Sequence, residues 1–205
     1  MRECPSCFQD ADVGFIIDSS ASIDNQEYQD QKDAVKSMIQ CLHESGDGFI
    51  TGMIQFSADA EIIYHLNAPE SAVNITIDNM DRDPSTTRID KALRLAQSQL
   101  FTRINGDREF IPNVLFVALD GSQTKAQGWE NPNGIADEIR AAGTDIVVLG
   151  IGNEISQFEI LQLAGGRQDR VFYAKDFDEF TQRSFIKQVI KRACVGKMKL
   201  FLLSF

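Results

Sequence analysis

The sequence has little of the nitrogen and sulfur chemistry on which many active sites depend. It contains only two histidines among 205 residues, and His43 and His65 are isolated from each other. A serine hydrolase needs a partnered histidine and a G-x-S-x-G turn, and neither is present. No G-x-G-x-x-G follows the first apolar segment, which argues against a dinucleotide site. Hydrolases of this type and nucleotide-dependent oxidoreductases are therefore disfavoured.

Basic residues and long apolar runs are also scarce. Lys and Arg total 20 against 30 Asp and Glu, which gives a net charge of −10. Nucleic acids and anionic membranes need a basic face, so neither is expected as a partner, whereas a cation is compatible. The apolar stretch LFLLSF at the end of the chain is too short to span a bilayer. The opening MRECPSC lacks the apolar core of a signal peptide, so we expect a mature piece of a secreted protein with an added Met1.

The length suits one domain with its own core. We expect an N-terminal segment at 1–9 with Cys4 and Cys7, a single domain at 10–194, and a C-terminal tail at 195–205. The tail is either an appended sequence or an interaction patch.

Strand-like and helix-like segments alternate along the domain. Apolar runs predict strands, and amphipathic patterns predict helices. The expected strands are 12–18, 49–57, 60–66, 113–120, 144–152 and 170–174, and the expected helices are 27–44, 69–80, 88–101, 131–143, 156–164 and 176–193. This order predicts an α/β, Rossmann-like fold with a doubly wound, mostly parallel central sheet, one antiparallel edge strand (60–66) and helices on both faces.

Acids and hydroxyls stand where strands of this sheet end, which is where such folds bind ligands. Asp18, Ser20 and Ser22 alternate after the first strand, Thr87 precedes a helix, and Asp120 follows the fourth strand. Oxygen ligands select a hard cation, so we expect Mg²⁺, with Mn²⁺ or Ca²⁺ as alternatives. Two carboxylates leave the cation electrophilic, and an open position could accept a partner's carboxylate. The simpler interpretation is that these residues only cap the following helix.

These motifs resemble the von Willebrand factor A domain family, and the similarity covers residues 10–194. D-x-S-x-S after the first strand, the threonine before a helix containing KALRLA, and DGS after the fourth strand follow the family's order. The resemblance implies a metal-ion-dependent adhesion site, whose ligands would be Asp18, Ser20, Ser22, Thr87 and Asp120.

The resemblance also implies a role in the extracellular matrix. The flanking cysteines resemble the matrix branch of the family, which includes matrilins, collagen VI and von Willebrand factor. We expect a secreted module of a larger multidomain protein, which binds a protein ligand through its cation, with collagen as the leading candidate. The alternative is a structural matrix module whose metal site binds no ligand. A metal-dependent phosphatase-like enzyme is less favoured, because Ser20 stands where a D-x-D phosphatase needs its second acid.

Three residues near the predicted site are candidates for its ligand-binding rim: Arg88, Trp129 and Glu130. An exposed aromatic residue there could contact a partner. The alternatives are that Trp129 packs on a neighbouring helix and that Arg88 is solvated.

The cysteines and one sequon favour an extracellular protein. We expect Cys4 or Cys7 to pair with Cys194 and link the chain ends, and Cys41 to be a small buried apolar residue. The alternative is that all four are reduced. The N-I-T tripeptide at Asn74 is an N-glycosylation sequon.

Overall fold

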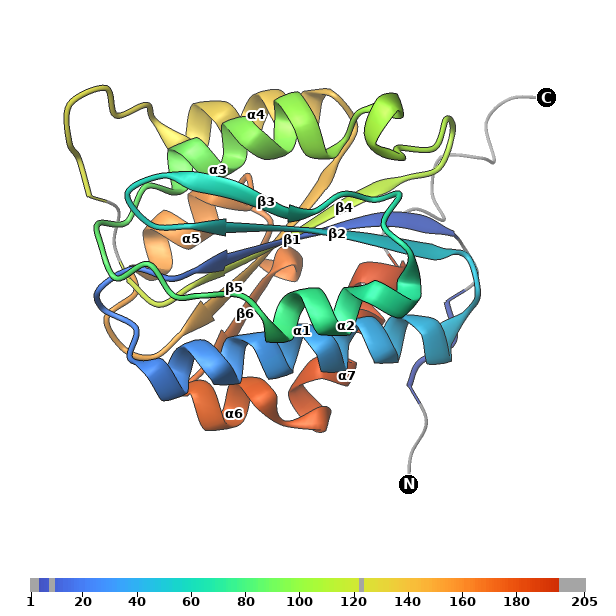
Figure 1. Cartoon of the computed structure of the whole chain (residues 1–205). Coiled ribbons are helices and arrows are strands. Elements are labelled where there is room, and N and C mark those ends of the chain that lie inside the picture. Colours follow the sequence, from blue (N-terminus) through green and yellow to red (C-terminus); the bar gives the residue numbers. More distant parts are fainter. Residues whose placement is uncertain (1–3, 8–9, 122–123, 196–205) are drawn as a thin grey trace.

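A central sheet of six strands organises the domain (Figure 1). The structure is a computed structural model, and it describes residues 4–7, 10–121 and 124–195. The strand order is β3-β2-β1-β4-β5-β6. The strands are β1 (Ala11–Asp18), β2 (Phe49–Phe56), β3 (Ala60–Tyr64), β4 (Asn113–Leu119), β5 (Asp145–Ile151) and β6 (Val171–Ala174). All neighbours are parallel except β2 and β3, so the predicted fold class is confirmed.

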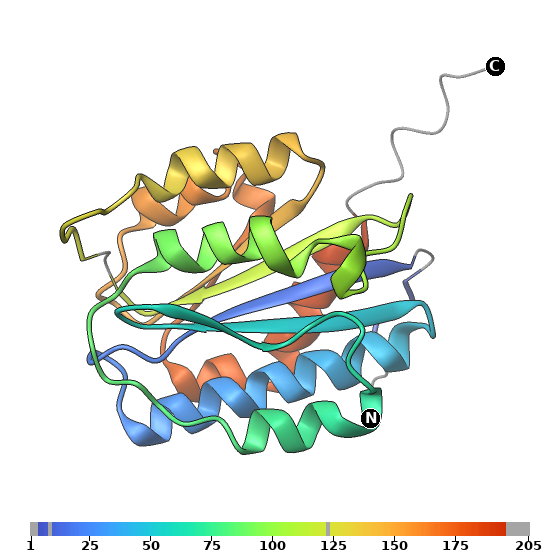
Figure 2. The same cartoon turned by 45° about the horizontal axis from the view of Figure 1, so that its top comes forward.

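Helices cover both faces of the sheet (Figures 1 and 2). One layer comprises α1 (Asn25–Ser45), α2 (Glu70–Asp78), α6 (Phe177–Thr181) and α7 (Arg183–Val195). The other comprises α3 (Ile89–Leu95), α4 (Pro132–Ala141) and α5 (Gln157–Leu163). A π-helical stretch, η1 (Ala96–Leu100), extends α3 to the predicted length. Of the predicted C-terminal tail, residues 196–205 lie outside the part of the chain that the structure describes.

The central strands are apolar on both sides because both sides face helices. Every residue of β1 is buried, and Phe15 packs towards α1 while Ile16 packs towards α3. Phe15 also stacks on Phe116 of β4, with 5.4 Å between ring centroids. This doubly covered core holds the strand ends, and hence the loops that follow them, in fixed positions.

The last helix differs from the prediction of one continuous helix at 176–193. The chain forms α6 and α7 instead, separated by Gln182, whose backbone is extended (ψ 132°). The break brings Phe180 and Phe185 edge to face at 5.8 Å, and both rings are buried. Burial of two large rings outweighs the continuity of one helix.

All four cysteines are in disulfides. Cys7 pairs with Cys194, which is one of the two predicted pairings. Cys4 pairs with Cys41 of α1, so the expectation of a reduced, apolar Cys41 was wrong. Cys41 is buried as expected, and its position on the face of α1 that packs against the domain lets the N-terminal segment reach it.

Candidate metal centre

Three loops meet at the carboxyl edge of the sheet. We call them the first loop (19–24, after β1), the second loop (79–88, before α3) and the third loop (120–121 and 124–131, after β4). Ala21 N donates to Ser85 O at 2.9 Å, which joins the first loop to the second. Thr124 N donates to Thr87 O at 2.9 Å and Thr124 Oγ1 accepts from Thr87 N at 3.2 Å, which joins the second to the third.

Side chains close the remaining side of this triangle. The Ser22 hydroxyl lies near enough to the Asp120 carboxylate to oppose the rise in its pKa, which links the first loop to the third. Ser20 Oγ lies 3.1 Å from Ser22 Oγ, and Ser20 N donates to Asp18 Oδ1 at 2.7 Å. Four of the five predicted ligands therefore form one connected group, and the fifth, Thr87, stands where the second and third loops are bonded together.

The two carboxylates of this group are incompletely partnered. Asp18 Oδ2 and Asp120 Oδ1 are buried, and neither has a hydrogen-bond partner among the residues described. A buried carboxylate oxygen without a partner is costly, because burial removes water and nothing replaces it. Unpartnered carboxylate oxygens at the ends of adjacent strands are consistent with a cation ligand set that has no cation bound.

Electrostatics reinforce this picture. Burial raises the pKa of Asp18 to about 7, the hydrogen bonds from Ser20 oppose that rise, and the nearby Asp120 charge adds to it. Burial likewise raises the pKa of Asp120; the Ser22 hydroxyl opposes that rise, and the charge of Glu27 adds to it. A divalent cation would relieve both the burial cost and the mutual repulsion.

Helix capping does not account for the predicted hydroxyl ligands. The N-cap of α1 is Asp24, whose Oδ1 accepts from Gln26 N and Glu27 N. Glu27 accepts from Asp24 N in return, which completes a capping box. Ser22 therefore takes no part in the cap, and its hydroxyl instead contacts Ser20 and Asp120.

The donor set fits a hard cation. It offers carboxylate and hydroxyl oxygens, which suit Mg²⁺, Mn²⁺ or Ca²⁺. Within residues 4–7, 10–121 and 124–195, no three His, Cys, Asp or Glu side chains are grouped closely enough to hold a metal ion. A site at this edge thus needs the hydroxyls of Ser20, Ser22 and Thr87 to complete its coordination.

Sequence reasoning missed residues that support the first loop. Gln31 of α1 donates from Nε2 to Asp18 O at 2.9 Å, and Ser19 Oγ donates to Phe56 O at 3.0 Å. Arg82 donates to Ser20 O at 3.2 Å and to Asn25 Oδ1 at 3.3 Å. A signal existed for Gln31, a polar residue within the apolar stripe of α1 and only 1% exposed. No sequence pattern pointed to Arg82.

The predicted rim is only partly on the surface. Arg88 is buried, where it pairs with Asp90 at 2.7 Å and donates to Gly128 O at 3.0 Å, so its expected place on the ligand-binding rim was wrong. Glu130 is exposed and pairs with Arg94 at 2.7 Å. Trp129 is half-buried, with Lys125 Nζ 5.3 Å from its ring centroid. Buried Arg88 holds the second and third loops together instead of facing a ligand.

Comparison with known proteins agrees with this fold. The profile of the von Willebrand factor type A domain matches residues 12–191. The collagen alpha-6(VI) chain of Mus musculus is 29% identical over 169 residues, which are 81% of this chain and 7% of that protein. Integrin alpha-M of Mus musculus is 29% identical over 166 residues, 77% of this chain and 13% of that protein. The chain thus spans a small part of these relatives.

Solved structures show the same fold. Proximal thread matrix protein 1 from the mussel byssus superposes with a TM-score of 0.83 at 24% identity, covering 95% of this chain and 50% of that one. A second structure of that protein, with a TM-score of 0.79 and 22% identity over 95% of this chain and 50% of that one, has a zinc-occupied MIDAS motif.

The relatives define the setting of the domain. Collagen VI chains, vitrin and the byssal thread protein are matrix proteins, which confirms the predicted extracellular matrix location. These relatives are structural and adhesion proteins rather than enzymes. No described helix has both the length and the apolar character needed to cross a membrane. The chain belongs to the von Willebrand factor type A domain family.

Proposed function

We propose that this domain binds a divalent cation through Asp18, Ser20, Ser22, Thr87 and Asp120, and that the bound cation captures an acidic side chain of an extracellular protein. The observation that carries the proposal is the pair of unpartnered, buried oxygens on Asp18 and Asp120. Mg²⁺ is the proposed ion, because the donors are all oxygens.

Each residue has a distinct role in the proposal. Asp18 and Asp120 supply negative charge from two adjacent strand ends, while the hydroxyls of Ser20, Ser22 and Thr87 supply neutral oxygens. When bound, the cation acts as a Lewis acid towards an incoming carboxylate. Because two carboxylates only just neutralise a divalent charge, the arrangement keeps an affinity for a third carboxylate from outside. Gln31 and Arg82 hold the backbone of the first loop in place.

The proposed partner is a protein of the extracellular matrix. Collagens are the first to test, since collagen VI chains are among the relatives and the byssal neighbour is a thread matrix protein. The small fraction of the collagen VI chains that this domain matches supports its place in a larger multidomain protein.

A chelator-controlled binding experiment tests the proposal. The protein is titrated with Mg²⁺ by calorimetry, and binding to immobilised matrix proteins, collagens first, is measured with Mg²⁺ or with EDTA. We expect saturable cation binding, and partner binding that EDTA abolishes. Asp18→Ala should lose both, whereas Asp83→Asn, which removes an exposed acid from the second loop, should keep both.

Two outcomes would contradict parts of the proposal. Partner binding that persists in EDTA would favour a structural matrix module that uses another surface. Absence of saturable cation binding to the wild-type protein would remove the site itself.

A further inference from the structure

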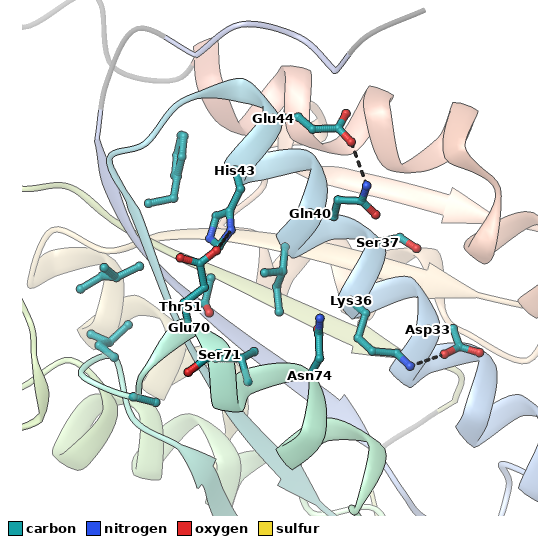
Figure 3. Close-up of a pocket in the computed structure, with 16 residues that line it drawn as sticks. Asp33, Lys36, Ser37, Gln40, His43, Glu44, Thr51, Glu70, Ser71 and Asn74 are labelled. Carbon is teal, nitrogen blue, oxygen red and sulfur yellow. Dashed lines mark hydrogen bonds and ion pairs between the residues drawn. The ribbon is translucent and has the colours of Figure 1, made fainter. Parts of the chain in front are cut away.

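A groove separates α1 from α2 on the face of the sheet that these helices cover (Figure 3). Its volume is about 1130 Å³. The floor is apolar and includes Ile39, Phe49 and Val73, each at most 9% exposed. The polar rim includes Lys36 and His43 of α1 and Ser71 and Asn74 of α2, while Ser37 and Gln40 line it from the side of α1 that carries Glu44. The groove thus combines an apolar base with a rim of hydrogen-bonding groups.

One ion pair and one histidine–carboxylate contact bridge the two helices beside this groove. Lys36 of α1 binds Asp78 of α2 at 2.6 Å, and His43 Nδ1 lies 2.8 Å from Glu70 Oε1. These contacts use Lys36 and His43, and Gln40 Nε2 donates to Glu44 Oε1 at 3.0 Å. Within the described chain, no hydrogen bond is made by the side chains of Ser37, Ser71 or Asn74. Ser71 and Asn74, which lie on α2 between Glu70 and Asp78, are therefore available to an occupant.

Asn74 is the acceptor position of the N-I-T sequon, and it is one of the residues that line this groove. It is exposed, and its side chain extends from α2 towards α1 (Figure 3). Thr76, the third residue of the sequon, is half-buried and donates its hydroxyl to Ala72 O at 3.0 Å. An attached sugar would begin inside the groove instead of projecting directly into solvent.

We propose that Asn74 carries an N-linked glycan whose first N-acetylglucosamine units lie in the α1–α2 groove and stabilise the packing of these two helices. Sugars present hydroxyls at their edges and C–H groups on their faces, which matches polar walls over an apolar floor. The inference does not rest on the cation site. It rests on the exposure and direction of Asn74 and on the unpaired polar groups around it.

The attachment is a simple exchange at one carbon. The donor is an oligosaccharide linked through a diphosphate to a lipid, the class of donor found in the secretory pathway. The Nδ2 atom of Asn74 forms a bond to C1 of the first N-acetylglucosamine. The bond from C1 to the diphosphate oxygen breaks, the lipid diphosphate leaves with its electron pair, and the amide nitrogen loses one proton. No oxidant or reductant is involved.

The location leaves the cation site accessible. Asp18 lies at the carboxyl end of β1, whereas Phe49 of the groove pairs with Ala11 at the opposite end of the same strand. A glycan in the groove would therefore cover the helical face near the amino edge of the sheet. Partner binding at the carboxyl edge would not compete with it.

Secretion from a glycosylating cell tests attachment. We expect the intact mass of the wild-type protein to exceed that of the polypeptide by one N-glycan, which peptide-N-glycosidase removes. Thr76→Ser keeps the sequon and should keep the glycan, whereas Thr76→Val and Asn74→Gln should lose it. A wild-type protein secreted without a glycan on Asn74 would overturn the proposal.

Hydrogen–deuterium exchange tests placement in the groove. An endoglycosidase trims the glycan to one N-acetylglucosamine, and this form is compared with Asn74→Gln. We expect amides of α1 between Ser37 and His43 to exchange at least about twofold more slowly in the glycosylated protein. Thr76→Ser should behave like the wild type. Identical exchange in α1 with and without the sugar would show that the glycan projects into solvent, and would overturn the groove assignment.

Discussion

Asp18 ends β1, and Asp120 comes directly after β4, the strand paired with β1. Each of the two residues keeps one buried carboxylate oxygen without a partner in the described part of the chain. Their charges repel, which contributes to the raised pKa of Asp18. The metal-free protein therefore holds two carboxylates in a place that disfavours their ionised forms. This cost is a property of the fold itself, and it can be measured without any partner.

Asp18→Asn should stabilise the metal-free protein at high pH. The pKa of Asp18 is about 7 in the folded protein against an ordinary value of 3.8, so folding takes up a proton between these values. Above pH 7 the wild type must keep a buried carboxylate, whereas Asn is neutral. The gain is at most about 4 kcal/mol above pH 7, and it shrinks as the pH falls towards 4. Urea unfolding in EDTA at several pH values measures it.

Asp83→Asn is the control for this measurement, because it removes an exposed acid from a neighbouring loop. Its stability should differ little from that of the wild type at every pH. A pH-independent effect of Asp18→Asn would mean that the amide changes packing and not charge. In Mg²⁺ the order should reverse, since the wild type gains cation binding energy that the variant lacks.

Thr87→Val should weaken cation binding while preserving the shape of the side chain. The substitution replaces a hydroxyl with a methyl group, and the bonds that the Thr87 backbone makes to the backbone and the hydroxyl of Thr124 remain. We expect affinity for Mg²⁺ to fall at least about tenfold, which is about 1.4 kcal/mol. Thr87→Ser, which keeps the hydroxyl, should bind within a few-fold of the wild type. Calorimetry or competition with Mn²⁺ measures the difference.

Thr86→Val provides the matched control, because Thr86 is the exposed neighbour of Thr87. It should leave affinity unchanged. Equal affinity of Thr87→Val and the wild type would remove this hydroxyl from the proposed ligand set.

The alternation of strands and the positions of the acids and hydroxyls were readable from sequence because they depend on local pattern. An apolar run followed by an acid marks the end of a doubly covered strand, and the parallel arrangement then brings Asp18 and Asp120 to one edge. The loop supports were harder to predict. Gln31 and Arg82 bond to backbone oxygens distant in sequence. The place of Gln31 in the apolar stripe of α1 marks it as buried but does not reveal its partner, and nothing near Arg82 marks that residue.

Arg88 and Cys41 are further residues whose partners the sequence pattern did not predict. An arginine beside a predicted ligand was expected at the surface, yet Asp90 two residues later supplies a buried partner. Cys41 lies in an apolar helix stripe that gives no sign of a bond to Cys4. Pairings between segments are set by three-dimensional proximity, which periodicity alone does not encode.

Arg88→Met should destabilise the fold and disturb the cation site indirectly. Arg88 is 6% exposed and Asp90 is 2% exposed, so the substitution leaves a buried carboxylate without its cation. Loss of one partner of a buried pair costs about 3–5 kcal/mol. The double variant Arg88→Met with Asp90→Leu should recover part of this loss, because no charge is left buried. Urea unfolding of the wild type, the single variant and the double variant measures the loss and its recovery. A mild loss in the single variant would indicate that water reaches Asp90.

Removing either disulfide should lower stability, with the larger effect for the pair that closes the longer loop. Cys7 and Cys194 are separated by 187 residues, and Cys4 and Cys41 by 37. The chain-entropy relation gives about 5 kcal/mol for the first link and about 4 kcal/mol for the second. We expect Cys7→Ser with Cys194→Ser, and Cys4→Ala with Cys41→Ala, to unfold at lower urea concentrations than the wild type. The stability of the reduced wild type should match that of a variant in which both pairs of cysteines are replaced. Because Cys41 is buried against the core, a stability of the Cys4→Ala, Cys41→Ala variant equal to that of the wild type would contradict a stabilising role for this disulfide.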